Sequence, residues 1–432
     1  MPTALTIDLR PLRRSRDLRF LFGGAALSQL GTALVAVTAG LQVYRLTHSS
    51  LAVGAISGVA AVPLIAGMLA GGVLADAWDR RWLIIASPCV AGASSVAMAL
   101  NASATHPSLW LVYGLLAAGA AAAGLGGPAG TAALPTLVAP GLLPATFAMS
   151  ATVRQLAALV GPAAGGLCVA RFGVPAVYAA GAGLGLGCGL VSLGIRPLPP
   201  AGAHGRVGLA AFTEGLRCAR RSALVIAVML IDADATVFGM PQALFPALGL
   251  ETFHAGPTGV GLLYAAPAAG ALLGALTSGW VGGVRHAGRA VLVAVTVWGV
   301  AIAAVGVVSL LPVALGLLAL AGAADLVSEV LRNSLLQQSV PEAFRGRLTA
   351  LWLAQANGAP ALGNLEAGGV ATLVTPAFSI VSGGLACVAG ALLLGGLMPV
   401  LRQARLRRDH DRGPAQTPAG ESPPAAGRRG RG

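Results

Sequence analysis

The chain has 432 residues, of which 56% are hydrophobic and only 10% are charged. Ordinary soluble domains carry about 25% charged residues, so this composition argues against a water-soluble globular protein. The net charge is +13, and every basic residue is arginine, since the chain contains no lysine. These arginines follow loops rather than one continuous surface, so they do not indicate a nucleic-acid partner.

Apolar segments long enough for membrane-spanning helices of about 20 residues follow one another along the chain. The first six are predicted at 20–46, 51–75, 82–100, 108–133, 146–170 and 174–195. The second six are predicted at 223–250, 258–281, 290–311, 312–336, 348–372 and 376–400. Internal prolines are compatible with helices in a membrane bundle, because neighbours satisfy the freed backbone groups. We therefore expect an all-α membrane protein with twelve transmembrane helices in two six-helix halves.

The spacing of these segments divides the chain into five parts. We expect an N-terminal arm at 1–19, bundles at 20–195 and 223–400, a central loop at 196–222 and a tail at 401–432. The central loop is predicted to carry an amphipathic helix, and the tail, rich in Pro, Gly and Arg, is predicted to be disordered. The arginine-rich start and the long first apolar run argue against a cleavable signal peptide.

Arginine placement predicts the orientation. Arginines gather before the first span, in the central loop, in the tail and in the loops after the second, eighth and tenth spans, whereas only Arg45 and Arg171 fall on the other side. Under the positive-inside rule, both termini lie in the cytoplasm of a cell-membrane protein. We expect the basic tails to lie against anionic lipid headgroups.

A charged turn follows the second span. Gly72 is followed four residues later by Asp76, and Asp76 four residues later by Arg80. This pattern resembles the loop between helices 2 and 3 of the major facilitator superfamily of secondary transporters. The resemblance implies that Asp76 faces the start of the eleventh span, near residue 348, and that Arg80 pairs with Asp79 or with an acid of the other half. Such contacts would exist in one access state only and so bias the equilibrium.

A second interpretation of this turn is topogenic, with Arg80 and Arg81 only holding the loop in the cytoplasm. Arg345 and Arg347, which precede the eleventh span, complete the predicted gating set.

Further motifs narrow the resemblance, which covers about residues 15–400. The segments at 16–20, 28–31, 126–129, 331–337, 345–347 and 363–368 are similar to the enterobactin-exporter and macrolide-efflux branch of the superfamily. The branch implies export, proton coupling and a small-molecule substrate.

The fifth span contains a stretch rich in glycine, 161–166. It resembles the signature of proton-coupled exporters, with Ala157 in place of the first glycine. Proline bends a helix, and small residues allow helices to slide; a plain packing face is the alternative. The predicted residues of this stretch are Arg154, Gly161, Pro162, Gly165 and Gly166. For Arg154, a cytoplasmic gate contact and a cavity contact are both open.

Ionisable residues inside a bilayer are functional candidates by default. Asp325, Glu329 and Arg332 are spaced i, i+4 and i+7, so they share one helix face. We expect Arg332 to neutralise Glu329, and Asp325 to lack so close a partner and to exchange a proton near neutral pH. The alternative for Asp325 is a structural ion pair, and for Arg332 a structural pair is favoured.

Three further acids fall in predicted spans. Asp232 and Asp234 are two residues apart and cannot share a helix face, so at most one is expected to line a cavity. Glu366 is either a coupling carboxylate or part of helix packing or an ion pair. We name Gln29, Tyr44, Tyr264 and Asn357 as candidate substrate contacts.

The isolated cysteines and histidines predict neither a metal site nor a cofactor. Without lysine, a phosphate-binding loop of the Gly-x-x-x-x-Gly-Lys type is impossible, so we expect a gradient rather than ATP to drive the protein. We predict a monomeric, non-enzymatic transporter that exports an amphipathic small molecule, such as a drug, macrolide or siderophore, in exchange for protons. The alternatives are a metabolite importer and a transport-inactive membrane sensor or assembly protein.

Overall fold

The computed structural model describes residues 10–199, 217, 220, 222–277, 284–339 and 342–406. The amphipathic helix expected in the central loop and most of the expected tail lie outside these residues. Between 342 and 350, only the backbone is described.

Helices of the first half begin with short polar side chains. Ser15, Ser49, Asp79 and Ser108 each accept a hydrogen bond from a backbone N–H of the first turn, which satisfies a donor that has no partner within the helix. The first half comprises α1 (Arg10–Arg14), α2 (Arg16–Thr47), α3 (Ser50–Ala77), α4 (Arg80–Ser103), α5 (Leu109–Leu137), η1 (Pro140–Leu142) and α6 (Leu143–Ser192). Gly173 breaks α6 with a φ of 82°, in the left-handed region that favours glycine. This one helix therefore supplies two spans.

The seventh predicted span is interrupted. Helix α8 (Ala223–Phe238) ends before Gly239 and Pro241, and the short η2 (Gln242–Leu244), α9 (Phe245–Ala247) and η3 (Leu248–Thr252) follow. The indole of Trp298 donates a 2.9 Å hydrogen bond to the carbonyl of Gly239, which the break leaves without a helical partner. The half continues with α10 (Gly256–Thr277), α11 (Ala287–Val305), α12 (Leu311–Ser339), α13 (Glu342–Leu373), α14 (Pro376–Leu397) and α15 (Pro399–Gln403).

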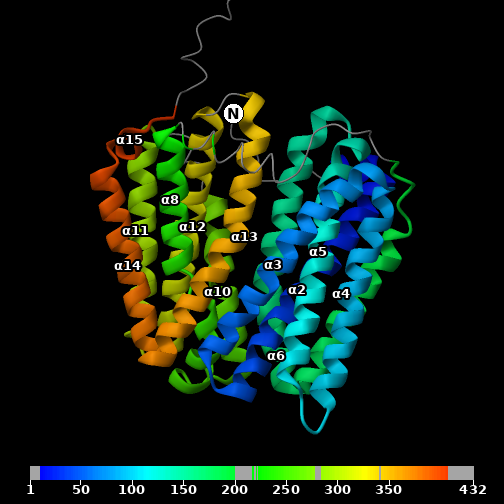
Figure 1. The fold of residues 1–432 in the computed structure, drawn as a ribbon, viewed down its shortest axis with the longest axis horizontal. Coiled ribbons are helices and arrows are strands. Elements are labelled where there is room, and N and C mark those ends of the chain that lie inside the picture. The colour runs from blue at the N-terminus through cyan, green and yellow to red at the C-terminus, as the bar shows by residue number, and fades with distance from the viewer. Residues whose placement is uncertain are drawn as a thin grey trace, which may run out of the picture.

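Ten helical segments in the described ranges are long and apolar enough to cross a membrane. Since α6 supplies two spans and the more polar α13 supplies another, the twelve-helix prediction is confirmed. Figure 1 shows α2–α6 and α8–α14 as two bundles side by side. We call the end where α2 begins and α14 ends the terminal face, and the opposite end the distal face. The ribbons of the two bundles converge toward the distal face (Figure 1).

Glycines bring the two halves together near the distal face. Gly54 of α3 lies against the backbone carbonyl of Asn364 of α13, and Gly166 of α6 lies against Gly261 of α10. A Cβ at either Gly54 or Gly166 would overlap backbone atoms of the other half, so these close approaches require glycine.

Candidate functional site

Arg80 of the charged turn is buried inside the first half. Its Nη2 lies 3.9 Å from Oδ1 of Asp76, its Nε donates to the carbonyl of Ala75 at 3.2 Å, and its Nη1 donates to the carbonyl of Ala132 at 3.2 Å. The expected pairing with Asp79 or with an acid of the other half is therefore wrong in this conformation. Asp79 is engaged elsewhere, because it caps α4.

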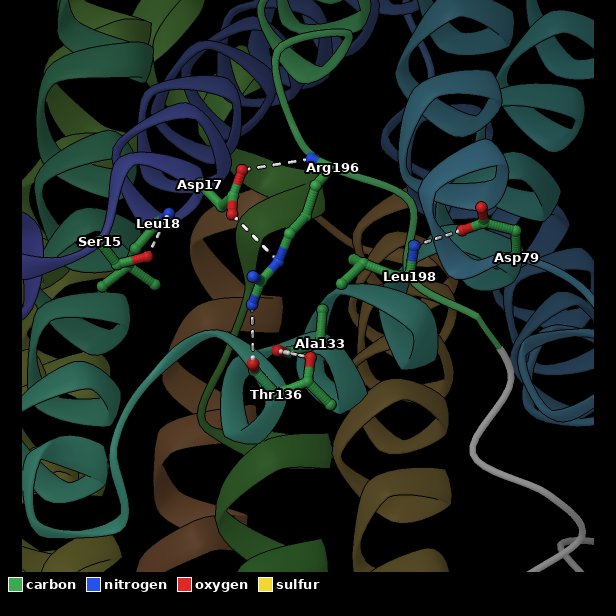
Figure 2. A network of polar contacts seen from close by, with 8 residues as sticks. All are labelled: Ser15, Asp17, Leu18, Asp79, Ala133, Thr136, Arg196 and Leu198. Atoms are coloured by element: carbon green, nitrogen blue, oxygen red, sulfur yellow. Dashed lines mark hydrogen bonds and ion pairs between the residues drawn. The ribbon is translucent and has the colours of Figure 1, made fainter.

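Asp79 also holds the start of the central loop (Figure 2). Its Oδ1 accepts hydrogen bonds from the backbone N–H groups of Arg81 and Leu198, both at 2.9 Å. Nearby, Nε of Arg196 lies 3.2 Å from Oδ2 of Asp17, and Nη2 of Arg196 donates to the carbonyl of Thr136 at 3.4 Å. We call Asp17, Asp79, Thr136, Arg196 and Leu198 the linker clasp. It ties the first residues after α6 to the ends of α2, α4 and α5.

The expected contact of Asp76 with the eleventh span stays a prediction. The first residues of α13, including Arg345 and Arg347, are described by backbone only, so the structure does not test their gating role. In the turn itself, Gly71 packs against the backbone of Leu125 on α5, whereas its neighbour Gly72 is half-buried.

The fifth-span stretch serves close packing. Gly161 and Gly165 face α2, and the carbonyl of Pro162 lies against Gly261 of α10, next to Gly166. Helix α6 stays continuous through Pro162 and leaves helical geometry only at Gly173. These contacts correspond to the packing interpretation of the stretch, with one face toward α2 and another toward the second half.

The second half contains a group of charges shared between helices. Nη2 of Arg332 on α12 lies 2.8 Å from Oδ1 of Asp232 on α8 and 3.7 Å from Oδ1 of Asp325 on α12. Gln355 of α13 donates from Nε2 to Oδ2 of Asp232 at 2.8 Å. We call Asp232, Asp325, Arg332 and Gln355 the charge cluster. The expectation that Arg332 neutralises Glu329 is wrong, because the guanidinium reaches α8 instead. The expectation that Asp325 lacks a close partner is wrong as well, because the same guanidinium lies 3.7 Å from its carboxylate.

Polar atoms of Arg332 and Asp234 are buried, so a change of charge on either side chain would alter the stability of the helix packing. The Arg332 side chain is 6% exposed, and its Nη1 has no hydrogen-bond partner among the described residues. Asp234, two residues beyond Asp232, lies against Gly390 of α14, and its buried Oδ2 is likewise unpartnered in the described part of the chain. Asp232 and Asp234 thus face different neighbours. Glu366 is half-buried on α13.

The first half contains a cavity of about 450 Å³. Helices α2, α4, α5 and both parts of α6 line it, and its lining includes two of the predicted residues, Gln29 and Arg154. Its other polar side chains are Ser28, Thr32, Ser87, Thr131, Ser150, Cys188 and Ser192. The described lining residues include no carboxylate and no residue of the second half.

The other candidate substrate contacts lie elsewhere. Tyr44 donates a 2.6 Å hydrogen bond to Oε1 of Glu251 near the distal face. Tyr264 donates to the carbonyl of Gln242 at 2.9 Å, and the amide of Asn357 donates to the carbonyl of Leu353 in its own helix at 2.7 Å. Tyr44, Tyr264 and Asn357 are thus not among the described lining residues of the cavity.

Sequence reasoning missed several polar residues that join the two halves. Glu251 accepts from Tyr44, as described above. Asn364 of α13 donates to Oγ of Ser57 on α3 at 3.0 Å, and Gln155 of α6 donates to the carbonyl of Ala268 on α10 at 2.8 Å. Asn364 lies inside the motif at 363–368, and Gln155 directly follows Arg154. Their positions in or beside these named features could have identified both as candidates. Glu251 lies one residue beyond the predicted seventh span and carried no such signal.

Known proteins match nearly the whole length of the chain. Residues 6–417 match the family described as transmembrane secretion effectors. The enterobactin exporter EntS of Citrobacter koseri is 32% identical over 405 residues, covering 92% of this chain and 96% of the relative. EntS of an Escherichia coli O6:K15:H31 strain is 31% identical over 420 residues, covering 96% and 98%.

Solved structures share the fold at low sequence identity. A POT family transporter in complex with 5-aminolevulinic acid superposes with a TM-score of 0.72 at 13% identity, covering 90% of this chain and 97% of that one. The nucleoside transporter NupG gives a TM-score of 0.71 at 13% identity, covering 88% and 99%.

Proposed function

Because this chain belongs to the transmembrane secretion effectors of the major facilitator superfamily, we propose that it exports a siderophore-like small molecule in exchange for protons. The similarity to enterobactin exporters over nearly the whole chain supports both the direction and the substrate type. The family is one of secondary transporters, so the protein moves its substrate without converting it.

We propose that the terminal face is cytoplasmic, as the arginine distribution predicts. The hydrogen bonds from Tyr44 to Glu251 and from Asn364 to Ser57 join the halves near the distal face. The conformation described here is then closed toward the outside, which is the state that loads substrate from the cytoplasm. Export requires these contacts to break after loading.

The charge cluster is the proposed proton site. Arg332 contributes one positive charge, whereas Asp232 and Asp325 contribute two negative charges, so the ionised trio has a net charge of −1. An uncompensated charge is unfavourable in a low-dielectric interior. Uptake of one proton by either carboxylate makes the trio neutral. The sharing of Arg332 between two carboxylates is the observation that carries the coupling proposal.

Gln355 connects the proposed proton site to the packing of α13. Its hydrogen bond to Asp232 holds α13 against α8, and α13 also carries Asn364, which contacts α3 in the first half. A carboxylate accepts hydrogen bonds more strongly than a carboxylic acid, so protonation of Asp232 weakens its bond with Gln355. Proton uptake thereby acts on the helix that joins the two halves.

Flux into inverted membrane vesicles tests this function, with tritiated enterobactin as the probe. Acidifying the lumen should drive accumulation in vesicles containing the protein, because protons leave as substrate enters. We expect Asp325→Asn to abolish this driven accumulation and to retain counterflow exchange, which needs no net proton movement. Asp234→Asn and Glu366→Gln remove carboxylates outside the charge cluster and serve as matched controls that retain driven flux.

Two results would overturn parts of the proposal. Accumulation under the opposite gradient would indicate an importer. Driven flux that survives Asp325→Asn but is lost in Glu366→Gln would assign proton coupling to Glu366 instead of the charge cluster.

A further inference from the structure

Arg154 is the one charged residue among the described residues that line the first-half cavity. It lies 11 residues after the start of α6, about three turns into the helix. Its side chain is exposed to the cavity space, and the structure gives it no ion pair with a described carboxylate. An arginine at this depth in a membrane protein is unfavourable unless an anion or water solvates it.

Neutral polar groups surround the same space. The hydroxyls of Ser28, Ser87 and Ser150 and the amide of Gln29 make no side-chain hydrogen bond to another described residue, although all four line the cavity. All four side chains are half-buried, so their polar atoms stay open to the cavity space. Their unused donors line the same cavity as the Arg154 guanidinium, where oxygen atoms of a ligand can satisfy them.

The remaining wall is apolar and has room. Leu21, Phe22 and Ile84 line one part of the cavity. On α5, Gly127 and Gly130 line another part, and a Cβ at either position would meet no atom within 4 Å. A volume of about 450 Å³ lies in the range of small-molecule pockets. The cavity lining thus combines one cation and several hydrogen-bonding side chains with apolar side chains.

We infer that this cavity binds an amphipathic anion, with the anionic oxygen-bearing group on Arg154 and an aromatic or alkyl body against the apolar wall. The inference deepens the proposed function, on which it rests, by taking the cavity as the transport site. Gln29 and the serine hydroxyls donate hydrogen bonds to the oxygens next to the anionic group. Charge-assisted hydrogen bonds from arginine to oxyanions are among the stronger protein contacts.

Two fluorescent probes test the charge requirement directly. 8-Anilinonaphthalene-1-sulfonate is an amphipathic anion, and N-phenyl-1-naphthylamine has the same aromatic skeleton without the sulfonate. Binding of each to the full-length protein in lipid nanodiscs is titrated by fluorescence, with protein-free nanodiscs subtracted. Arg154→Gln should weaken sulfonate binding by about tenfold or more and leave neutral-probe binding unchanged. Arg154→Lys keeps the positive charge and should retain most sulfonate binding.

Filling the cavity tests the location of binding. Gly127→Phe should reduce binding of both probes, because the ring occupies the open space beside α5. Gly114→Phe is the matched control, since Gly114 is an exposed glycine of the same helix that does not line the cavity and has no atom within 4 Å of its Cβ position.

The outcomes separate this inference from the transport proposal. Equal effects of Arg154→Gln on both probes, or no effect on either, would overturn the anion inference, and so would unchanged binding in Gly127→Phe. Neither result depends on a proton gradient. Conversely, a charge-selective cavity in a protein that fails to accumulate enterobactin would support the inference and reject the proposed function.

Discussion

Tyr44 and Glu251 lie 207 residues apart in the chain, and a 2.6 Å hydrogen bond joins them across the boundary between the two halves. The Tyr44 side chain is buried at the end of α2, while the Glu251 side chain is 56% exposed. His48 lies beside them, with Nδ1 4.0 Å from Oε1 of Glu251. Because water reaches the acceptor, this contact can break without leaving a buried, unpaired carboxylate.

Tyr44→Phe removes this hydrogen bond and should favour opening of the distal face. A hydrogen bond to a charged group contributes about 1.5–3 kcal/mol, and partial exposure of Glu251 reduces this to about 1 kcal/mol, or roughly a fivefold change in population. Spin labels at Ala104 and Val307, on distal loops of the two halves, report the opening as a longer distance by pulsed electron resonance.

Tyr113→Phe is the matched control for this measurement. The Tyr113 hydroxyl donates to the carbonyl of Ala52 at 2.7 Å, within the first half. The variant loses a hydrogen bond whose two partners both belong to the first half, so the distal distance should not change. A change of the same size in both variants would contradict a specific role for Tyr44.

Gly166→Ala should also open the distal face, by steric means. An added Cβ would overlap the carbonyl of Pro257 and the backbone of Gly261, so α6 and α10 would have to separate. We expect the same pair of spin labels to report a longer mean distance than in the parent protein. Gly183→Ala on the same helix meets no atom within 4 Å and should leave the distance unchanged. An unchanged distance in Gly166→Ala would show that this contact does not hold the halves together.

The linker clasp makes a prediction about the start of the central loop. Asp79→Ala removes the acceptor for the Leu198 N–H and the cap of α4, which contributes about 1 kcal/mol. Hydrogen exchange of the Leu198 amide should accelerate by roughly fivefold. Ser15→Ala removes a comparable helix cap on α2 that does not contact the linker. Equal acceleration in both variants would mean that the loop is not held by Asp79.

Much of the helical architecture could be predicted because lipid imposes it. Apolar runs of span length and prolines tolerated within helices indicated the twelve segments, and the break at Gly173 falls in the gap left between the fifth and sixth spans. The interruption of the seventh span after Phe238 was missed. Pro241 alone does not predict it, because α6 stays continuous through Pro162, and the Trp298 indole that stabilises the break is 59 residues away.

The sequence predicted which charged residues belong to the candidate site, but not which of them contact one another. Residue spacing placed Asp325, Glu329 and Arg332 on one face of α12. It did not show that α8 would present Asp232 within 2.8 Å of the guanidinium, because that depends on how two helices pack. Arg80 likewise donates to backbone carbonyls of α3 and α5. Every residue has a backbone carbonyl, so the sequence does not indicate which ones Arg80 contacts. Partners of this kind follow from tertiary packing alone.

The location of the cavity within the first half has a thermodynamic consequence. All described lining residues belong to the first half, so a bound molecule keeps the same polar neighbours when the second half moves relative to the first. A ligand that binds two conformers with equal affinity shifts their ratio not at all, however tightly it is held. Substrate binding alone would then not shift the equilibrium between the two access states. The direction of transport would have to come from protonation of the charge cluster in the second half.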